Sequence, residues 1–233
     1  MSKPRTKRNP AEIIGRILFV TLILSVIYSF VRVVITPEVP KDGNIYAHGR
    51  SDYILMFIQC LLGLVVLSLP SIMGRKWNVA IPNFIYIMYY LFLYCAIFLG
   101  EVLDFYYVIP HWDTILHFFS GAMLGALGFI LVSWLNDSEA IRVSLSPAFV
   151  ALFAFCFALS CGAVWEIYEY VFDGLLGLNM QKFITAEGVV LAGHDALRDT
   201  MKDIIVDAAA ALLMAGIGYS RLKAEKWLDK TKE

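Results

Sequence analysis

Residues 100–121 read GEVLDFYYVIPHWDTILHFFSG and separate two long apolar runs, one ending near Leu99 and the other continuing to Leu135. The stretch places Glu101, Asp104, Asp113 and His117 between these two runs. A charged side chain in hydrocarbon costs about 2.5–3.5 kcal/mol by insertion scales, so such groups rarely persist without a partner or a role. The stretch therefore marks a candidate site between two membrane spans.

The composition is that of a polytopic membrane protein. Of the 233 residues, 59% are hydrophobic and 17% are charged, and the mean hydropathy is +0.69. A soluble domain of this length carries more charge and less apolar sequence. The four cysteines lie inside apolar runs without metal-ligand spacing, so we expect buried thiols and no disulfides. The sequence has no nucleotide-binding, hydrolase-elbow or haem motif, and nucleic-acid binding has no support.

Six apolar runs are each close to the twenty residues that a bilayer core requires: residues 17–35, 53–69, 81–99, 114–135, 146–172 and 199–218. The first is too long for a signal peptide and lacks a small-residue cleavage site. The second stops at Pro70, and the fifth starts at Ser146-Pro147, where proline suits a first helical turn. We expect an all-α fold with a basic segment at residues 1–12, one six-helix domain at 13–218, a glycine-containing loop from Asp173 to about Asp195, and a charged tail at 219–233.

The positive charges predict the orientation in the membrane. With both termini in the cytoplasm, thirteen of the nineteen lysines and arginines face the cytoplasm. This asymmetry follows the positive-inside rule. We therefore predict a multi-pass membrane protein with cytoplasmic N- and C-termini.

This topology brings the acidic side chains of the apolar runs to the outer ends of the helices. Two later segments add to the first stretch and supply further acids: Glu166, Glu169, Asp199, Asp203 and Asp207. Glu166 and Glu169 share a helix face, as do Asp113 and His117. The three aspartates form a stripe that descends about 12 Å and continues as Ala211 and Ala215, small residues suited to close helix contact. We therefore expect Asp207 to point into the bundle.

Some of these charges also have an ordinary structural explanation. Asp113, with Thr114, and Asp199 stand where residues cap a helix N-terminus. This explanation fails for Glu166 and Glu169, which lie near a C-terminus where the helix dipole opposes them. For His117, a buried hydrogen-bonded histidine and a ligand or proton-transfer role remain equally open.

The motifs resemble those of one known family. The series Glu101-x-x-Asp104-Phe105-Tyr106, Trp112-Asp113-x-x-Leu116-His117, Trp165-Glu166-Ile167-x-Glu169 and Asp199-Thr200-x-x-Asp203 is similar to the YjdF-like bacterial inner-membrane proteins. The resemblance covers most of the chain and implies a multi-pass protein of a bacterial inner membrane, but it supplies no reaction. A weaker likeness to VanZ-like proteins favours a role in the cell envelope.

Three functions fit the pattern. The first is a metal-dependent enzyme acting on an amphiphilic or lipid-linked envelope substrate, with Mg²⁺, Mn²⁺ or Zn²⁺ bound by one histidine and several carboxylates. Its candidate ligands are Glu101, Asp104, His117, Asp199, Asp203 and Asp207, with Asp113 and Thr200 as accessory residues. Its candidate catalytic residues are Glu166, Glu169 and His117.

The alternatives are a proton- or cation-coupled transporter and a structural or partner-binding protein. In the structural alternative, a hydrogen-bonded acidic cluster locks the helices together. The six runs show no clear internal repeat, which argues against a transporter. Gly121 and Gly125 form a GxxxG pair that serves helix packing and also admits a homo-oligomer.

Overall fold

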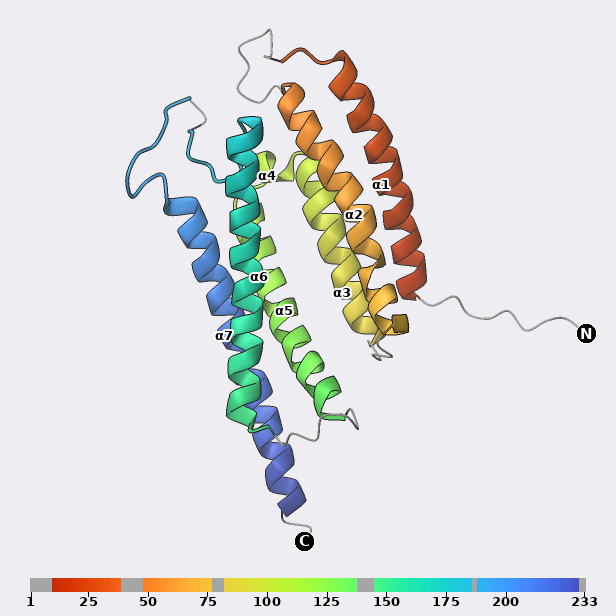
Figure 1. The fold of residues 1–233 in the computed structure, drawn as a ribbon, viewed down its shortest axis with the longest axis vertical. Coiled ribbons are helices and arrows are strands. Elements are labelled where there is room, and N and C mark those ends of the chain that lie inside the picture. Colours follow the sequence, from red (N-terminus) through yellow and green to blue (C-terminus); the bar gives the residue numbers. More distant parts are fainter. Residues whose placement is uncertain (1–9, 39–47, 77–81, 138–144, 186–187, 231–233) are drawn as a thin grey trace, which may run out of the picture. The chain divides into compact units, whose positions relative to one another are not determined.

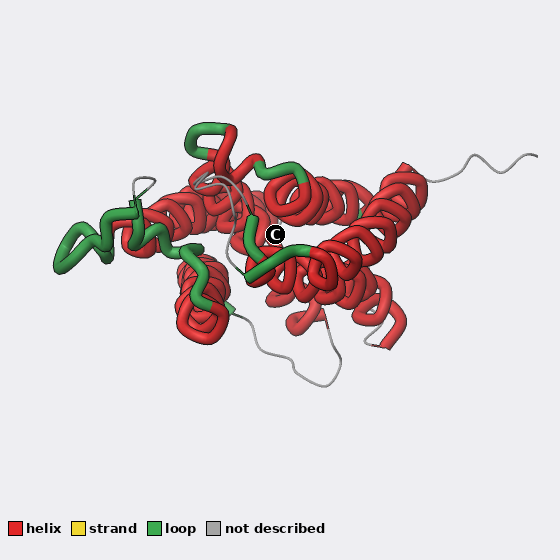
Figure 2. The backbone as a smooth tube through the Cα atoms, turned by 90° about the horizontal axis from the view of Figure 1, so that it is seen from above, coloured by secondary structure: helices red, strands yellow, loops and turns green. Residues whose placement is uncertain are grey.

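The computed structural model describes residues 10–38, 48–76, 82–137, 145–185 and 188–230. Its helices are α1 (Pro10–Ile35), α2 (Arg50–Lys76), α3 (Asn83–Leu93), the π-helix η1 (Tyr94–Val102), α4 (Phe105–Val108), α5 (Trp112–Asp137), α6 (Pro147–Leu176) and α7 (Arg198–Lys230). The described chain contains no strand, as Figure 2 shows. The predicted all-α class is therefore confirmed. Residues 1–9 of the predicted basic segment and 231–233 of the predicted tail lie outside the described residues.

The chain forms two compact units, unit 1 (Met1–Trp112) and unit 2 (Asp113–Glu233). We describe each by itself, so the single domain expected for residues 13–218 stays a prediction. In unit 1, α1, α2 and α3 pack side by side (Figure 1). Their core contains Leu18 and Leu22 of α1, Leu67 of α2 and Leu93 of α3, and burying these side chains stabilises the unit.

The second predicted helix does not stop at Pro70, because α2 continues through this proline to Lys76. A proline inside a helix has no N–H and leaves the carbonyl four residues earlier without its partner. That carbonyl belongs to Val66, and the hydroxyl of Tyr89 in α3 donates to it at 2.6 Å. The hydroxyl of Tyr86 donates to the Pro70 carbonyl at 3.2 Å. Tyr89 thus supplies the hydrogen bond that Pro70 removes from the Val66 carbonyl.

Tyr89→Phe should lower the free energy of unfolding by about 0.5–2 kcal/mol, because it leaves the Val66 carbonyl without a partner in an apolar setting. Thermal unfolding of the detergent-purified protein measures this loss. The control is the same substitution in a Pro70→Ala background, where the N–H of residue 70 can bond to Val66. An equal cost of Tyr89→Phe in both backgrounds would contradict this explanation.

The third predicted helix changes geometry at its midpoint. The α-helix α3 continues directly as the π-helix η1, in which the Leu103 N–H bonds to the Phe98 carbonyl. Such segments are rare and often occur at functional sites. Asp104 follows with a left-handed backbone, φ 61°, and begins the short helix α4. Glu101 and Asp104 therefore lie on an irregular connection rather than at a simple helix end.

In unit 2, glycines let α5, α6 and α7 approach one another closely. A Cβ at Gly128 of α5 would lie 2.7 Å from the Ala154 Cα of α6, and one at Gly125 would lie 3.0 Å from the Met214 Cβ of α7. The Gly121 and Gly125 pair thus faces α7 of the same chain. The predicted packing role is confirmed, and homo-oligomerisation through this pair stays a prediction.

The ends of α6 follow from capping residues. Ser146 accepts a hydrogen bond from the Phe149 N–H, and Pro147 occupies the first turn as predicted. The C-terminus lies at Gly177, whose φ of 65° suits glycine. This end is later than expected, so Asp173 is a buried helical residue and not the start of the loop. The helix α7 also runs beyond the predicted end at residue 218, as far as Lys230.

Among the residues that the structure describes, five helical segments are long and apolar enough to cross a membrane: Pro10–Ile35, Arg50–Ile72, Asn83–Val102, Trp112–Val132 and Pro147–Leu176. They correspond to the first five predicted spans, with bounds that differ from the predicted ones by a few residues. The sixth, in α7, does not meet these criteria of length and composition. Many large apolar side chains are exposed, including Leu24, Leu152 and Leu212, as expected for helices surrounded by lipid. The protein is thus a multi-pass membrane protein.

Candidate functional site

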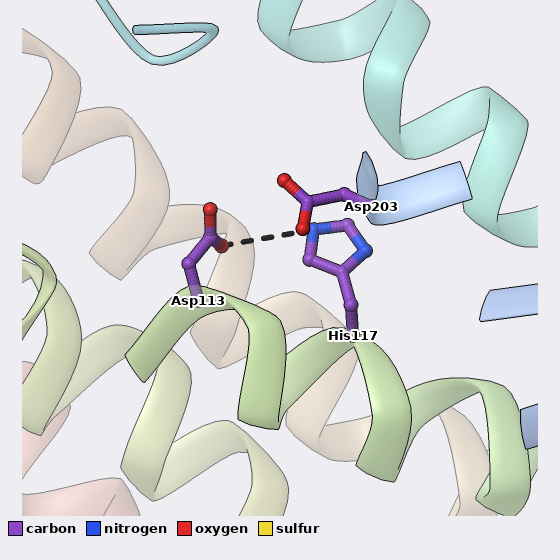
Figure 3. Close-up of side chains that lie close together, drawn as sticks. All are labelled: Asp113, His117 and Asp203. Carbon is purple, nitrogen blue, oxygen red and sulfur yellow. Dashed lines mark ion pairs between the residues drawn. The ribbon is translucent and has the colours of Figure 1, made fainter. Parts of the chain in front are cut away.

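Three potential metal ligands converge in unit 2. Asp113, His117 and Asp203 each offer one ligand atom, and these atoms all lie within 4.8 Å of one another. Figure 3 shows Asp113 and His117 one turn apart on α5, with Asp203 reaching toward them from α7. The i,i+4 spacing places the first two on one helix face, as predicted. We call these three residues the acidic–histidine trio.

The two ring nitrogens of His117 face different carboxylates. Nδ1 lies 3.2 Å from Oδ2 of Asp207, while Nε2 lies 3.6 Å from Asp113 Oδ1 and 3.6 Å from Glu166 Oε1. When Asp207 accepts the Nδ1–H, the lone pair of the neutral ring is on Nε2. Metal-binding histidines have this arrangement, in which a carboxylate holds one nitrogen so that the other points at the ion.

Glu166 lies beside the trio, and its two carboxylate oxygens accept no hydrogen bond among the described residues. Its side chain is 4% exposed. Asp203 Oδ1 and Asp207 Oδ1 are likewise buried without a hydrogen bond. Buried carboxylate oxygens are costly when unsatisfied. Four such oxygens around one histidine indicate a place for a bound cation or for protons.

Close packing of α6 on α7 fixes Asp207. Its side chain lies against Gly162 of α6, where an added Cβ would collide with Asp207 Oδ2 and would lie 2.8 Å from its Cγ. The face that carries Asp203 and Asp207 continues as Ala211 and Ala215, and all four are buried. The prediction that Asp207 points into the bundle is therefore confirmed.

The loop after α6 brings a cation to the trio. Lys182 Nζ lies 2.6 Å from Asp113 Oδ2 and 3.1 Å from Asp199 Oδ2. Burial alone would lower the pKa of the Lys182 ammonium, but the two aspartates raise this pKa above its usual range. Lys182 is therefore a fixed positive charge at the outer edge of the site.

The predicted capping roles of Asp113 and Asp199 do not appear among the described contacts. Both residues lie in first helical turns, where the helix dipole stabilises a negative charge, but their carboxylates pair with Lys182. Thr200 accepts a hydrogen bond from Gln181 at 2.8 Å. Asp199 and Thr200 thus anchor the loop.

Other predicted site residues have partners elsewhere. Glu169 is buried and accepts a hydrogen bond from Trp165 Nε1 at 3.0 Å. Asp104 lies 2.8 Å from His48 in unit 1, and Glu101 is in the same unit. Their inclusion in one metal site with the trio stays a prediction.

Sequence reasoning missed Lys182, Asp173 and His48. Lys182 and His48 lie in connections without a periodic pattern, and long-range pairing brings them to Asp113 and Asp104 respectively. Asp173 was assigned to the loop, whereas its carboxylate accepts the Met180 and Gln181 N–H groups at 2.7 and 3.0 Å. A weak signal existed for Asp173, because its spacing from Glu169 puts both on one helix face.

Comparisons with known proteins address the family. A family model described as "Predicted membrane protein (DUF2238)" matches residues 16–224. An uncharacterized protein of Thermotoga maritima is 30% identical over 124 residues, which are 53% of this chain and 55% of the relative. The chain thus spans about half the length of the curated relative that it matches. No solved structure matches the chain significantly.

Proposed function

The chain belongs to the DUF2238 family of predicted membrane proteins, which are the YjdF-like proteins, and we propose that it is a metal-dependent membrane enzyme. The observation that carries the proposal is the trio of Asp113, His117 and Asp203, whose ligand atoms lie within 4.8 Å of one another. A histidine with carboxylates suits a hard or borderline divalent ion such as Mg²⁺, Mn²⁺ or Zn²⁺. The buried Glu166 carboxylate beside His117, whose oxygens accept no hydrogen bond among the described residues, gives further support.

Each residue has a distinct role in this proposal. Asp113, His117 Nε2 and Asp203 hold the ion, and Asp207 orients the imidazole through Nδ1. Glu166 Oε1 lies 3.6 Å from His117 Nε2, and Glu166 is not one of the three ligands. It is therefore the carboxylate that we assign as general base. The bound ion supplies a Lewis acid that activates water or polarises a substrate oxygen. Glu169 is committed to Trp165, so Glu166 is the better candidate base of the two.

The position of the site in the chain suggests the substrate. We propose that α7 is a sixth span and that both termini are cytoplasmic, as the distribution of positive charge favours. The trio then lies at the outer ends of α5 and α7, within reach of the outer leaflet of a bacterial inner membrane. An amphiphilic or lipid-linked envelope substrate fits this depth.

Elemental analysis of the detergent-purified protein tests the metal site. We expect about one equivalent of a divalent metal in the wild type, and its loss in His117→Ala and Asp203→Asn. Asp195→Asn is the matched control, because Asp195 is an exposed acid of the same region, paired with Arg198. A folded wild type without metal after supplementation with Mg²⁺, Mn²⁺ and Zn²⁺ would sink the proposal.

That negative result would favour the structural function. Three of the acids already have ordinary partners. Glu169 accepts a hydrogen bond from Trp165, Asp173 accepts backbone N–H groups, and Asp199 pairs with Lys182. In that case Asp203→Asn should keep or raise thermal stability, because it removes one charge from a crowded buried cluster. The same set of variants thus separates the two functions.

A further inference from the structure

In the segment from Gly177 to Thr185, hydrogen bonds on both sides of Lys182 fix the position of this residue. Asp173 accepts the N–H groups of Met180 and Gln181 at 2.7 and 3.0 Å. The Gln181 side chain donates to Thr200 at 2.8 Å, which ties the segment to α7. On the other side, Asn179 bonds to both backbone groups of Ile184 at 2.7 and 2.9 Å.

Lys182 itself has an unfavourable backbone conformation. Its φ is 49°, in the left-handed region that residues other than glycine rarely adopt. The surrounding hydrogen bonds hold it there, and its ammonium meets Asp113 Oδ2 at 2.6 Å although the side chain is 40% exposed. Backbone strain of this kind is often found at functional sites, and here it places the ammonium beside Asp113.

The Lys182 ammonium pairs with Asp113, one of the ligands of the proposed metal. Asp113 turns Oδ2 to Lys182 and Oδ1 to His117 Nε2, so one carboxylate serves both the ammonium and the trio. A divalent ion in the trio would lie a few ångströms from the ammonium and would be repelled by it. Lys182 also neutralises Asp199, which further reduces the attraction of this end of the site for cations.

We propose that Lys182 sets the affinity of the metal site by competing with the ion for Asp113. This inference rests on the proposed metal site and adds a residue that regulates it. In the ion-free protein the lysine offsets the repulsion among the clustered acids. When the ion binds, it must share Asp113 with this fixed cation, and the site therefore binds and releases its ion more readily.

Lys182→Met should therefore act in opposite directions on stability and on ion binding. In the full-length detergent-purified protein we expect a lower unfolding temperature in EDTA, and a Kd for Mn²⁺ or Zn²⁺ that is about tenfold tighter or more. Thermal unfolding and competition against a fluorescent chelator measure the two effects. Lys182→Gln removes the charge but keeps a donor, and it provides the same test if Lys182→Met does not fold.

Two control variants complete the experiment. Lys182→Arg keeps the charge and should restore a Kd close to that of the wild type. Arg198→Met removes an exposed cation of the same region, which pairs with the exposed Asp195, and should leave the Kd unchanged.

Two results would overturn the inference and can be told apart. Equal or weaker ion binding by folded Lys182→Met and Lys182→Gln refutes the competition and leaves the metal site standing. Absence of Mn²⁺ and Zn²⁺ binding in the wild type and in both variants, all folded, refutes the proposed function and this inference together.

Discussion

Gly162→Ala should destabilise unit 2 by roughly 3 kcal/mol or more, although it adds a single methyl group to an α-helix. The new Cβ would collide with Asp207 Oδ2, the oxygen that faces His117 Nδ1. Overpacking alone costs about 1–3 kcal/mol, and leaving the buried Asp207 carboxylate and the His117 N–H without each other costs about 1–3 kcal/mol more. The change in helix propensity, which favours alanine, is too small to compensate.

Gly174→Ala is the matched control in the same helix. Nothing lies within 4 Å of the Cβ that it would add, so alanine should be neutral or stabilise the protein by up to about 1 kcal/mol. Thermal unfolding in detergent compares the stability of the two variants, and their metal content shows whether the proposed metal site is intact. Similar unfolding temperatures for Gly162→Ala and the wild type would mean that α6 and α7 do not meet as the structure has them.

The helices could be predicted because local signals define them. Ser146-Pro147 starts α6 at the predicted place, and the apolar runs contain the cores of the other spans. Pro70 misled the prediction because its effect depends on Tyr89, a residue of another helix that satisfies the freed carbonyl. Local sequence reports what a backbone prefers, whereas partners distant in the sequence decide whether an exception is tolerated.

The candidate site divides in the same way. The stripe of Asp203 and Asp207 and the pair of Asp113 and His117 could be found from helical spacing, because each set lies on one face. The partner of Asp113 could not be found, since Lys182 is 69 residues away in an irregular loop. Sequence also treated Asp207 as equivalent to Asp203, and only the geometry shows that they approach His117 differently.

Asp203→Asn and Asp207→Asn should therefore differ in their effect on metal binding. Asp203 belongs to the trio, so neutralising it removes a ligand and we expect bound metal to be lost. Asp207 faces Nδ1 of His117 and acts through the imidazole. An asparagine oxygen still accepts the Nδ1–H, so the ring keeps its orientation while its basicity falls, and we expect a loss of affinity of about 10–100-fold.

Titration of the two purified variants with Mn²⁺ or Zn²⁺ separates these effects, with Asp195→Asn as the exposed control. Equal losses in both variants would make Asp207 a ligand, as the sequence alone suggested. An unchanged Kd in Asp207→Asn would restrict Asp207 to helix packing against Gly162. We expect a larger loss in Asp203→Asn than in Asp207→Asn because the two aspartates lie one turn apart on α7 and meet different parts of His117. Asp203 lies within the trio, whereas Asp207 faces Nδ1.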